Sequence, residues 1–224
     1  ARPEVLVEAT STEEVAAVVK LCNENKVPVT PSGARTGLVG GAVSIGGGVM
    51  ISLTKMNKIL GYDKENFVVK IQSGVLLNDL AQDAEKQGLL YPPDPGEKFA
   101  CVGGNVATNA GGMRAVKYGC TRDYVRAMTV VLPTGEIVKL GATVSKTSSG
   151  YSLLNLMIGS EGTLGIITEL TLKVIPAPKS VISLIIPYEN LEDCIATVPQ
   201  FFMHHLAPQA LEFMEKEVVM DTEK

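Results

Sequence analysis

The stretch Pro31-Ser-Gly-Ala-Arg-Thr-Gly-Leu-Val-Gly-Gly-Ala42, followed closely by Gly46-Gly47-Gly48, decides the interpretation of this chain. It holds seven of the 22 glycines among the 224 residues. Glycine at this density costs backbone entropy on folding and adds no side chains to the core, so stability does not explain why so many glycines occur here. The common reason is a loop whose backbone N–H groups closely approach a charged oxygen, as in the nests that hold phosphate. We therefore predict a phosphate-binding loop after a short strand at Val27–Pro31.

Both standard nucleotide-binding loops are absent from the sequence. No G-x-G-x-x-G occurs, and no glycine is followed by Lys-Ser or Lys-Thr. The first pattern marks the Rossmann dinucleotide site and the second marks the P-loop. The sequence therefore predicts a pyrophosphate site of a third design.

Two further small-residue blocks follow the first. Pro92-Pro-Asp-Pro-Gly96 leads into Cys101-Val-Gly-Gly-Asn-Val-Ala-Thr-Asn-Ala-Gly-Gly112, and Gly159-Ser-Glu-Gly-Thr-Leu-Gly-Ile-Ile-Thr168 comes later. Three such blocks predict one extended ligand lying across several loops. Together they resemble the FAD-binding domain of the vanillyl-alcohol oxidase/p-cresol methylhydroxylase superfamily over residues 3 to 176. The nearest likeness is to flavin-dependent 2-hydroxyacid dehydrogenases of the glycolate oxidase D subunit, D-lactate and D-2-hydroxyglutarate types.

The resemblance implies noncovalent FAD and a role for each block. The first block wraps the pyrophosphate, the second runs beside the ribityl chain and isoalloxazine, and the third lies beneath the adenosine. Some members attach FAD through His or Cys, but the first block contains neither, and Cys101 and Cys120 are interpreted as packing residues. The candidate cofactor-binding residues are Ser32, Gly33, Ala34, Arg35, Thr36, Gly37, Leu38, Pro93, Asp94, Gly96, Gly103, Gly104, Asn105, Thr108, Asn109, Ala110, Gly111, Glu161, Gly162, Gly165, Ile166 and Ile167.

Oxidation of a 2-hydroxyacid requires more than the flavin. Hydride transfer to flavin N5 needs a clamp for the substrate carboxylate, usually Arg, and a base for the hydroxyl. In the resembling dehydrogenases these groups, and a His-liganded divalent metal, come from a C-terminal substrate domain. The adjacent His204 and His205 point in different directions on any helix or strand and make a poor metal pair. We therefore assign no catalytic residue and no metal ligand here.

Two alternatives to the dehydrogenase interpretation stay open. One is a related flavin oxidase or sugar-lactone oxidase of the same superfamily, although the missing histidine argues against its covalent members. The other is a noncatalytic FAD-binding or electron-transfer subunit. For the dehydrogenase, the expected partners are a 2-hydroxyacid and an electron acceptor, namely a quinone, an electron-transferring flavoprotein or a cytochrome. A homodimer and a hetero-complex are both compatible with the sequence.

Composition narrows the class of protein. The net charge is −4 and no Lys/Arg run occurs, which excludes nucleic acid as an expected partner. No apolar run reaches the roughly 18 residues of a membrane span, and no signal peptide opens the sequence. The four cysteines show no C-x-x-C spacing, as expected for free thiols in a reducing compartment. We expect a cytoplasmic protein, peripheral to the membrane at most through a partner.

Residue patterns predict an α+β fold. The resemblance implies a two-subdomain FAD-binding domain over residues 1–176 and, over 177–224, the opening of an α+β substrate domain that we expect this chain not to finish. Pro176-Ala-Pro178 marks the boundary, and the residues beyond it are too few for a robust core. The expected elements are a helix after the capping box Ser11–Glu14, strands at Val49–Leu53 and Phe67–Ile71, a helix from Leu77 closed by Gly88, a hairpin of Arg126–Leu132 with Ile137–Leu140, a strand at Ile167–Ile175, a strand at Val181–Ile186, a helix at Asn190–Val198 and another beginning at Ala210–Met214.

Overall fold

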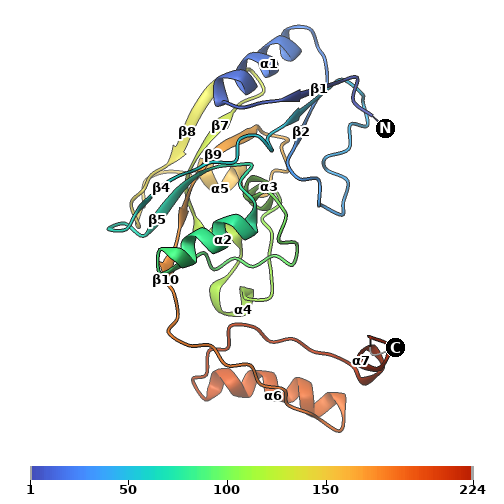
Figure 1. Cartoon of the computed structure of the whole chain (residues 1–224), viewed down its shortest axis with the longest axis vertical. Coiled ribbons are helices and arrows are strands. Elements are labelled where there is room, and N and C mark those ends of the chain that lie inside the picture. The colour runs from blue at the N-terminus through green and yellow to red at the C-terminus, as the bar shows by residue number, and fades with distance from the viewer. Residues whose placement is uncertain (1, 223–224) are drawn as a thin grey trace.

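Two unlike sheets form the body of the molecule (Figure 1). The computed structural model describes residues 2–222. The N-terminal sheet is parallel, with its three strands in the order β1 (Val5–Glu8), β3 (Val49–Ser52) and β2 (Val29–Ser32). Helix α1 (Thr12–Glu24) connects the two outer strands and buries Val15 and Val19 in the adjoining core. The β2 strand lies at an edge, where Pro31 is tolerated because no neighbour needs its missing N–H.

The second sheet is antiparallel and has five strands. Their order is β4 (Ile59–Asp63), β5 (Val68–Gln72), β9 (Ile166–Lys173), β7 (Val125–Val131) and β8 (Ile137–Gly141). Its inner face packs against α2 (Leu77–Lys86) and α3 (Val102–Ala107). The fully buried side chains of this core include Ile71, Leu80, Val102, Leu170 and Leu172.

Short elements complete the body and connect its layers. The strand β6 (Leu89–Leu90) pairs with β10 (Ile175–Pro176). Beyond α3 lie α4 (Ala115–Tyr118), a 3-10 turn at Thr121–Tyr124 and α5 (Leu153–Met157). A buried hydrogen bond of 2.9 Å from Thr12 Oγ1 to Thr168 Oγ1 ties the start of α1 to β9. The two sheets are therefore joined by polar as well as apolar contacts.

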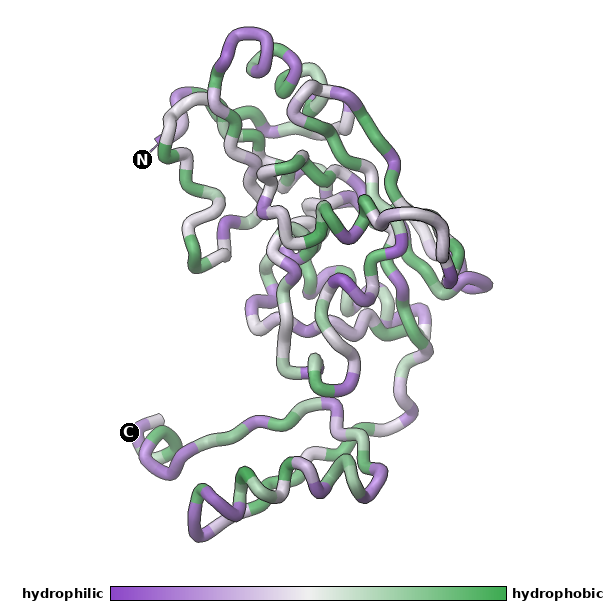
Figure 2. The backbone as a smooth tube through the Cα atoms, turned by 180° about the vertical axis from the view of Figure 1, so that it is seen from behind, coloured by the Kyte–Doolittle hydropathy of each residue, from purple (hydrophilic) through white to green (hydrophobic). Residues whose placement is uncertain are grey.

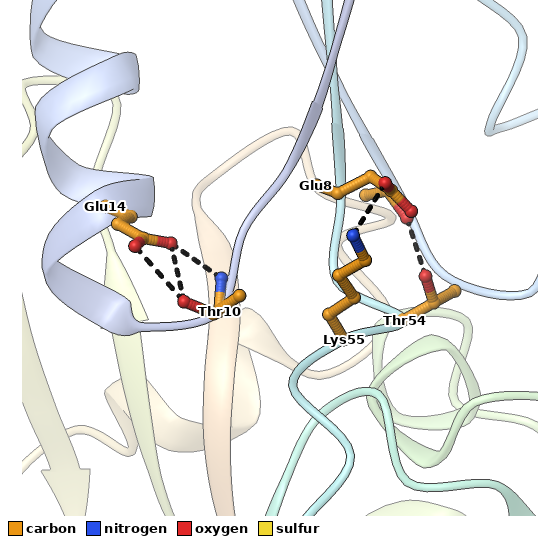
Figure 3. A network of polar contacts seen from close by, with 6 residues as sticks. Glu8, Thr10, Glu14, Thr54 and Lys55 are labelled. Carbon is orange, nitrogen blue, oxygen red and sulfur yellow. Dashed lines mark hydrogen bonds and ion pairs between the residues drawn. The ribbon is translucent and has the colours of Figure 1, made fainter.

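Side chains around β1 and α1 hold the first subdomain together (Figure 3). Ser11 Oγ accepts a hydrogen bond from Glu14 N at 3.2 Å, as the sequence predicts. The Glu14 carboxylate accepts from Thr10 N at 2.7 Å, one residue before the partner that a capping box would use. These bonds from Thr10 lower the pKa of Glu14. Lys55 Nζ lies 2.9 Å from a carboxylate oxygen of Glu8 and links β1 to the segment after β3.

Most elements expected within residues 1–176 are confirmed, with bounds shifted by a residue or two. The first half alternates strand and helix around a parallel sheet, and the second half is antiparallel, so the α+β class is correct. The strands β1 and β4 were not predicted. The central part of the second glycine block also differs, since it forms the helix α3 rather than one of the expected loops.

Two predictions for the C-terminal segment are wrong. Residues 181–186 form no strand, and the last helix is α7 (Lys216–Thr222) rather than one that begins at 210–214. An apolar, β-branched segment forms a strand only when a neighbour accepts its ladder hydrogen bonds, and within residues 2–222 no strand pairs with it. The predicted helix at 190–198 is confirmed as the longer α6 (Leu191–Met203).

Residues 177–222 run away from both sheets as an arm (Figure 1). Its apolar segments are visible in Figure 2, and Ile182 and Ile185 are 81% and 92% exposed. None of the α6 residues is buried. No helix within the described part of the chain is long and apolar enough to cross a membrane.

Candidate functional site

The three glycine blocks, far apart in the sequence, meet in space. A Cβ built on Gly33 would lie 3.0 Å from Cys101 Cβ, so the first block packs on the second. A Cβ built on Gly162 would lie 2.6 Å from Pro31 Cγ, which places the third block against the strand that leads into the first. Glu161 N donates to Ala107 O at 2.9 Å and joins the third block to the second. The fold therefore brings the three glycine blocks together.

The first block presents free backbone donors. Among residues 2–222, no protein group accepts a hydrogen bond from the amides of residues 35–42. Arg35 has a φ of 60°, a left-handed conformation that non-glycine residues seldom adopt. A Cβ on Gly37 would meet nothing within 4 Å. Unpaired N–H groups in a glycine-rich loop are the arrangement that holds an anionic phosphate oxygen, so this segment fits a pyrophosphate. Ser32 Oγ donates to Gly33 O at 3.2 Å and serves the loop itself.

Glycines of the second block fall into two kinds. A Cβ on Gly103 would lie 2.4 Å from Ser73 Cβ, and one on Gly112 would lie 2.2 Å from Asp94 O, so both glycines are required by protein packing. By contrast, a Cβ on Gly96 or Gly104 would meet no atom within 4 Å, and none of these glycines has a positive φ. Gly96, Gly104 and Gly111 are called the open glycines below; the last would meet only Cys120 Sγ, at 4.0 Å.

Gly104 is the most informative of the open glycines because it lies inside α3. Glycine within a helix is less stable than alanine by about 0.5–1 kcal/mol. Neither its backbone conformation nor its protein neighbours explain the choice. A flat ligand that approaches the backbone would explain it, and an isoalloxazine ring is such a ligand.

The two kinds of glycine predict opposite effects on stability. Gly112→Ala forces backbone against backbone, so the free energy of unfolding should fall by about 1–3 kcal/mol, as for other overpacked sites. Gly104→Ala should leave it unchanged or raise it, because the added methyl meets no atom and alanine favours the helix. Urea unfolding of the flavin-free proteins measures both. Equal destabilisation by the two substitutions would contradict the division into packed and open glycines.

Polar side chains of the second block differ in whether they are already hydrogen-bonded within the protein. Asn105 is only 6% exposed, and its Nδ2 has no hydrogen-bond partner among the described residues. Thr108 Oγ1 donates to Gly104 O at 3.1 Å, and Asn109 Oδ1 accepts from Arg122 N at 3.0 Å. A buried donor without an acceptor is costly, so Asn105 is the strongest candidate of the three for a hydrogen bond to the cofactor.

The third block borders an apolar cavity. The cavity has a volume of about 250 Å³ and is lined by Val29, Pro31, Val131, Gly162, Thr163 and Ile166, among others. Glu161 and Gly162 both have positive φ values, of 51° and 79°. Ile166 and Ile167 pair with β7 in the ladder and are nearly buried. The apolar walls suit a planar base better than a charged group.

The Cys101 thiol, which packs on Gly33, is poorly suited to a covalent flavin bond. Burial raises the pKa of Cys101, although the Ala34 amide opposes this. Thiolate is the reactive form of cysteine, so burial disfavours the form of Cys101 that could bond to a flavin. Within residues 2–222 no cluster of three or more His, Cys, Asp or Glu side chains could hold a metal ion.

An ion cluster lies where the second block begins and ends. Asp94 Oδ1 pairs with Lys98 Nζ, and Asp94 Oδ2 lies 3.4 Å from Arg114 Nε. Asp94 was predicted as a cofactor residue, whereas the structure pairs its carboxylate with two cations. Arg114 is not among the candidate residues expected from the sequence. Its only sequence signal is its position two residues after Gly112.

This fold, with three converging glycine blocks and free loop amides, defines a dinucleotide-binding domain. Its sequence matches the family described as FAD binding domain over residues 3–141, and the chain belongs to that family. The resemblance inferred from the glycine blocks is thus confirmed.

Curated relatives carry names from hydroxyacid metabolism. The chain is 99% identical over its whole length to a D-lactate dehydrogenase of Anaerostipes hadrus, covering 47% of that protein. It is 44% identical over 98% of its length to a D-lactate dehydrogenase of Archaeoglobus fulgidus, and covers 49% of it. It is 38% identical over 97% of its length to the glycolate oxidase subunit GlcD of Bacillus subtilis, covering 47%. The chain thus spans about half the length of these relatives.

Solved structures agree on the fold. An alkyldihydroxyacetonephosphate synthase superposes with a TM-score of 0.69 at 32% sequence identity. The match covers 78% of this chain and 34% of the synthase. A second crystal form of the synthase gives the same score.

Proposed function

We propose that this chain binds FAD noncovalently at the three glycine blocks. The observation that carries the proposal is the set of open glycines, above all Gly104, which neither conformation nor packing explains. Further support comes from the free amides of residues 35–42. In this proposal the loop amides hold the pyrophosphate, the open glycines face the isoalloxazine, and the apolar cavity beside Gly162 takes the adenine.

We further propose that the protein containing this chain oxidises a 2-hydroxyacid of the D-lactate or glycolate type to the 2-oxoacid. Support comes from relatives named D-lactate dehydrogenase and glycolate oxidase subunit. FAD supplies the hydride acceptor when bound. The glycine blocks of this chain would hold the cofactor, and the buried Nδ2 of Asn105 would donate a hydrogen bond to it.

The proposal also divides the protein into parts. Residues 1–176 form the FAD-binding domain, and residues 177–224 begin a substrate domain. Support comes from the exposed apolar side chains of the arm, which need a covering partner. The base and a His-liganded divalent metal would belong to the other half of the longer protein. An electron acceptor (quinone, electron-transferring flavoprotein or cytochrome) and a cytoplasmic location complete the proposal; the four free cysteines fit that location.

The cofactor assignment predicts which flavin the protein releases. Precipitation of the purified protein with acid should leave a colourless pellet and a yellow supernatant whose flavin chromatographs as FAD. FMN in the supernatant would contradict the adenosine site. A pellet that keeps its colour would contradict noncovalent binding.

The substrate assignment is tested on the full-length protein. D-lactate, glycolate and D-2-hydroxyglutarate are each mixed anaerobically with the FAD-loaded protein, and the visible flavin absorbance is followed. At least one of them should bleach the flavin rapidly, with L-lactate as the stereochemical control. A flavin that none of them bleaches would refute the proposed reaction.

A further inference from the structure

The ion cluster of Asp94, Lys98 and Arg114 lies beside the open glycines. Gly96 stands between the first two of these residues in the chain. A Cβ on Gly112 would lie 2.2 Å from Asp94 O and 2.7 Å from Pro95 N, so the segment before Arg114 packs backbone to backbone on the segment after Asp94. The cluster is therefore built into the part of the site that is proposed to face the isoalloxazine.

The cluster carries a net positive charge in an acidic chain. Two cations share one carboxylate, which leaves +1 at this place against −4 for the whole sequence. The Asp94 side chain is 13% exposed, whereas those of Lys98 and Arg114 are 41% and 33% exposed. The acid is thus the buried member, and the two cations reach the surface.

Among residues 2–222 the guanidinium of Arg114 forms one ion pair, with Asp94. Asp94 Oδ2 lies 3.4 Å from Nε. Among residues 2–222 no group accepts a hydrogen bond from either terminal nitrogen of Arg114. A guanidinium held at Nε keeps its Nη1–Nη2 pair, a planar fork that matches the two oxygens of a carboxylate.

We propose that Arg114 binds the carboxylate of the substrate through its two terminal nitrogens, with Lys98 adding positive charge. The proposal rests on the proposed function, which puts an anionic 2-hydroxyacid against the isoalloxazine. We do not expect Arg114 to bind the phosphates of FAD, because the free amides of residues 35–42 are the proposed hydrogen-bond donors to the phosphates. Part of the carboxylate clamp therefore belongs to the FAD-binding half of the protein.

The test uses the full-length, FAD-loaded protein with Arg114→Gln, which removes the charge, and Arg114→Lys, which keeps the charge but removes the fork. Lys117→Gln is the matched control, since Lys117 lies on α4, the helix that Arg114 precedes as N-cap, is exposed, and has its Nζ 5.3 Å from the centroid of the Tyr118 ring. Calorimetry measures the affinity of the oxidised protein for oxalate, a carboxylate that cannot be oxidised by hydride transfer. Anaerobic flavin reduction compares D-lactate with D-lactamide, which lacks the carboxylate charge.

Arg114→Gln should weaken the binding of oxalate and of D-lactate roughly ten- to hundredfold, as expected for the loss of charge-assisted hydrogen bonds. Arg114→Lys should weaken oxalate binding less than Arg114→Gln does. Flavin reduction by D-lactamide should change little in either variant. Lys117→Gln should change the affinity for oxalate by less than about twofold. FAD content and thermal unfolding confirm that each variant is loaded and folded.

Three results distinguish a role of Arg114 in substrate binding from a role in cofactor binding, and test the proposed reaction separately. Unchanged oxalate affinity in Arg114→Gln overturns the proposal. Loss of FAD from both Arg114 variants also overturns it, because the residue then belongs to the cofactor site. Oxalate binding that depends on Arg114, in a protein whose flavin no 2-hydroxyacid reduces, supports the carboxylate site and refutes the proposed reaction.

Discussion

A protein of residues 1–224 alone is expected to hold FAD yet reduce it with D-lactate at least about 10²–10⁴-fold more slowly than the full-length protein. That range is the typical contribution of general base catalysis, and positioning adds to it. The base is proposed to lie in the half of the protein that this chain does not span. Without that half the proposed reacting face is open to water.

Stopped-flow reduction under anaerobic conditions measures this loss. The reference is the full-length D-lactate dehydrogenase of Anaerostipes hadrus, 99% identical over these residues. Both proteins must first be shown to carry equal amounts of FAD, since a shortage of cofactor would imitate a slow reaction. Rapid bleaching of the short protein by D-lactate, glycolate or D-2-hydroxyglutarate would place the catalytic base within residues 1–224.

Gly104→Val and Gly111→Val should each remove FAD while the domain stays folded. Both substitutions add three carbon atoms to a surface that is open in the protein alone but is proposed to contact the ring. Displacing the ring costs at least what overpacking costs, about 1–3 kcal/mol, or roughly a ten- to hundredfold loss of affinity. Flavin absorbance per mole of purified protein gives the occupancy.

Two control variants distinguish displacement of the flavin from a general effect of an added side chain and from loss of the fold. Ala81→Val adds methyl groups to an exposed position of α2, and should keep full occupancy. Gly103→Ala places its Cβ 2.4 Å from Ser73 Cβ and should destabilise the fold itself. Full flavin occupancy in both valine variants would show that the second glycine block lies elsewhere relative to the ring.

The sequence predicts the fold well where a pattern has a local cause. Ser11 caps α1, and Gly88, at a φ of 74°, follows the end of α2. The hairpin of β7 and β8 forms where Pro133 and Gly135 require a turn. Residues 181–186 have the same β-prone composition as a true strand, but strand formation depends on a partner that the pattern does not reveal.

The site is predictable only in part, for a similar reason. Glycine density identifies the blocks, because glycine has no side chain and so allows the backbone to lie close to a ligand or to another segment of the chain. The sequence cannot separate Gly103, which faces Ser73, from Gly104, which faces open space, because the two are neighbours with the same composition around them. The proposed role of Arg114 could not be predicted from the sequence, because it depends on the ion pair with Asp94, which lies twenty residues away in the sequence.

The loop of residues 35–42 has one more consequence. Its free donors belong to the main chain, and every residue except proline carries the same N–H group. In the proposed site the backbone amides, not the side chains, hold the phosphates, and the side chains of Leu38 and Val39 are 100% and 79% exposed. The proposed preference of this loop for phosphate would therefore depend mainly on the path of the main chain, with Arg35 as its one cationic side chain.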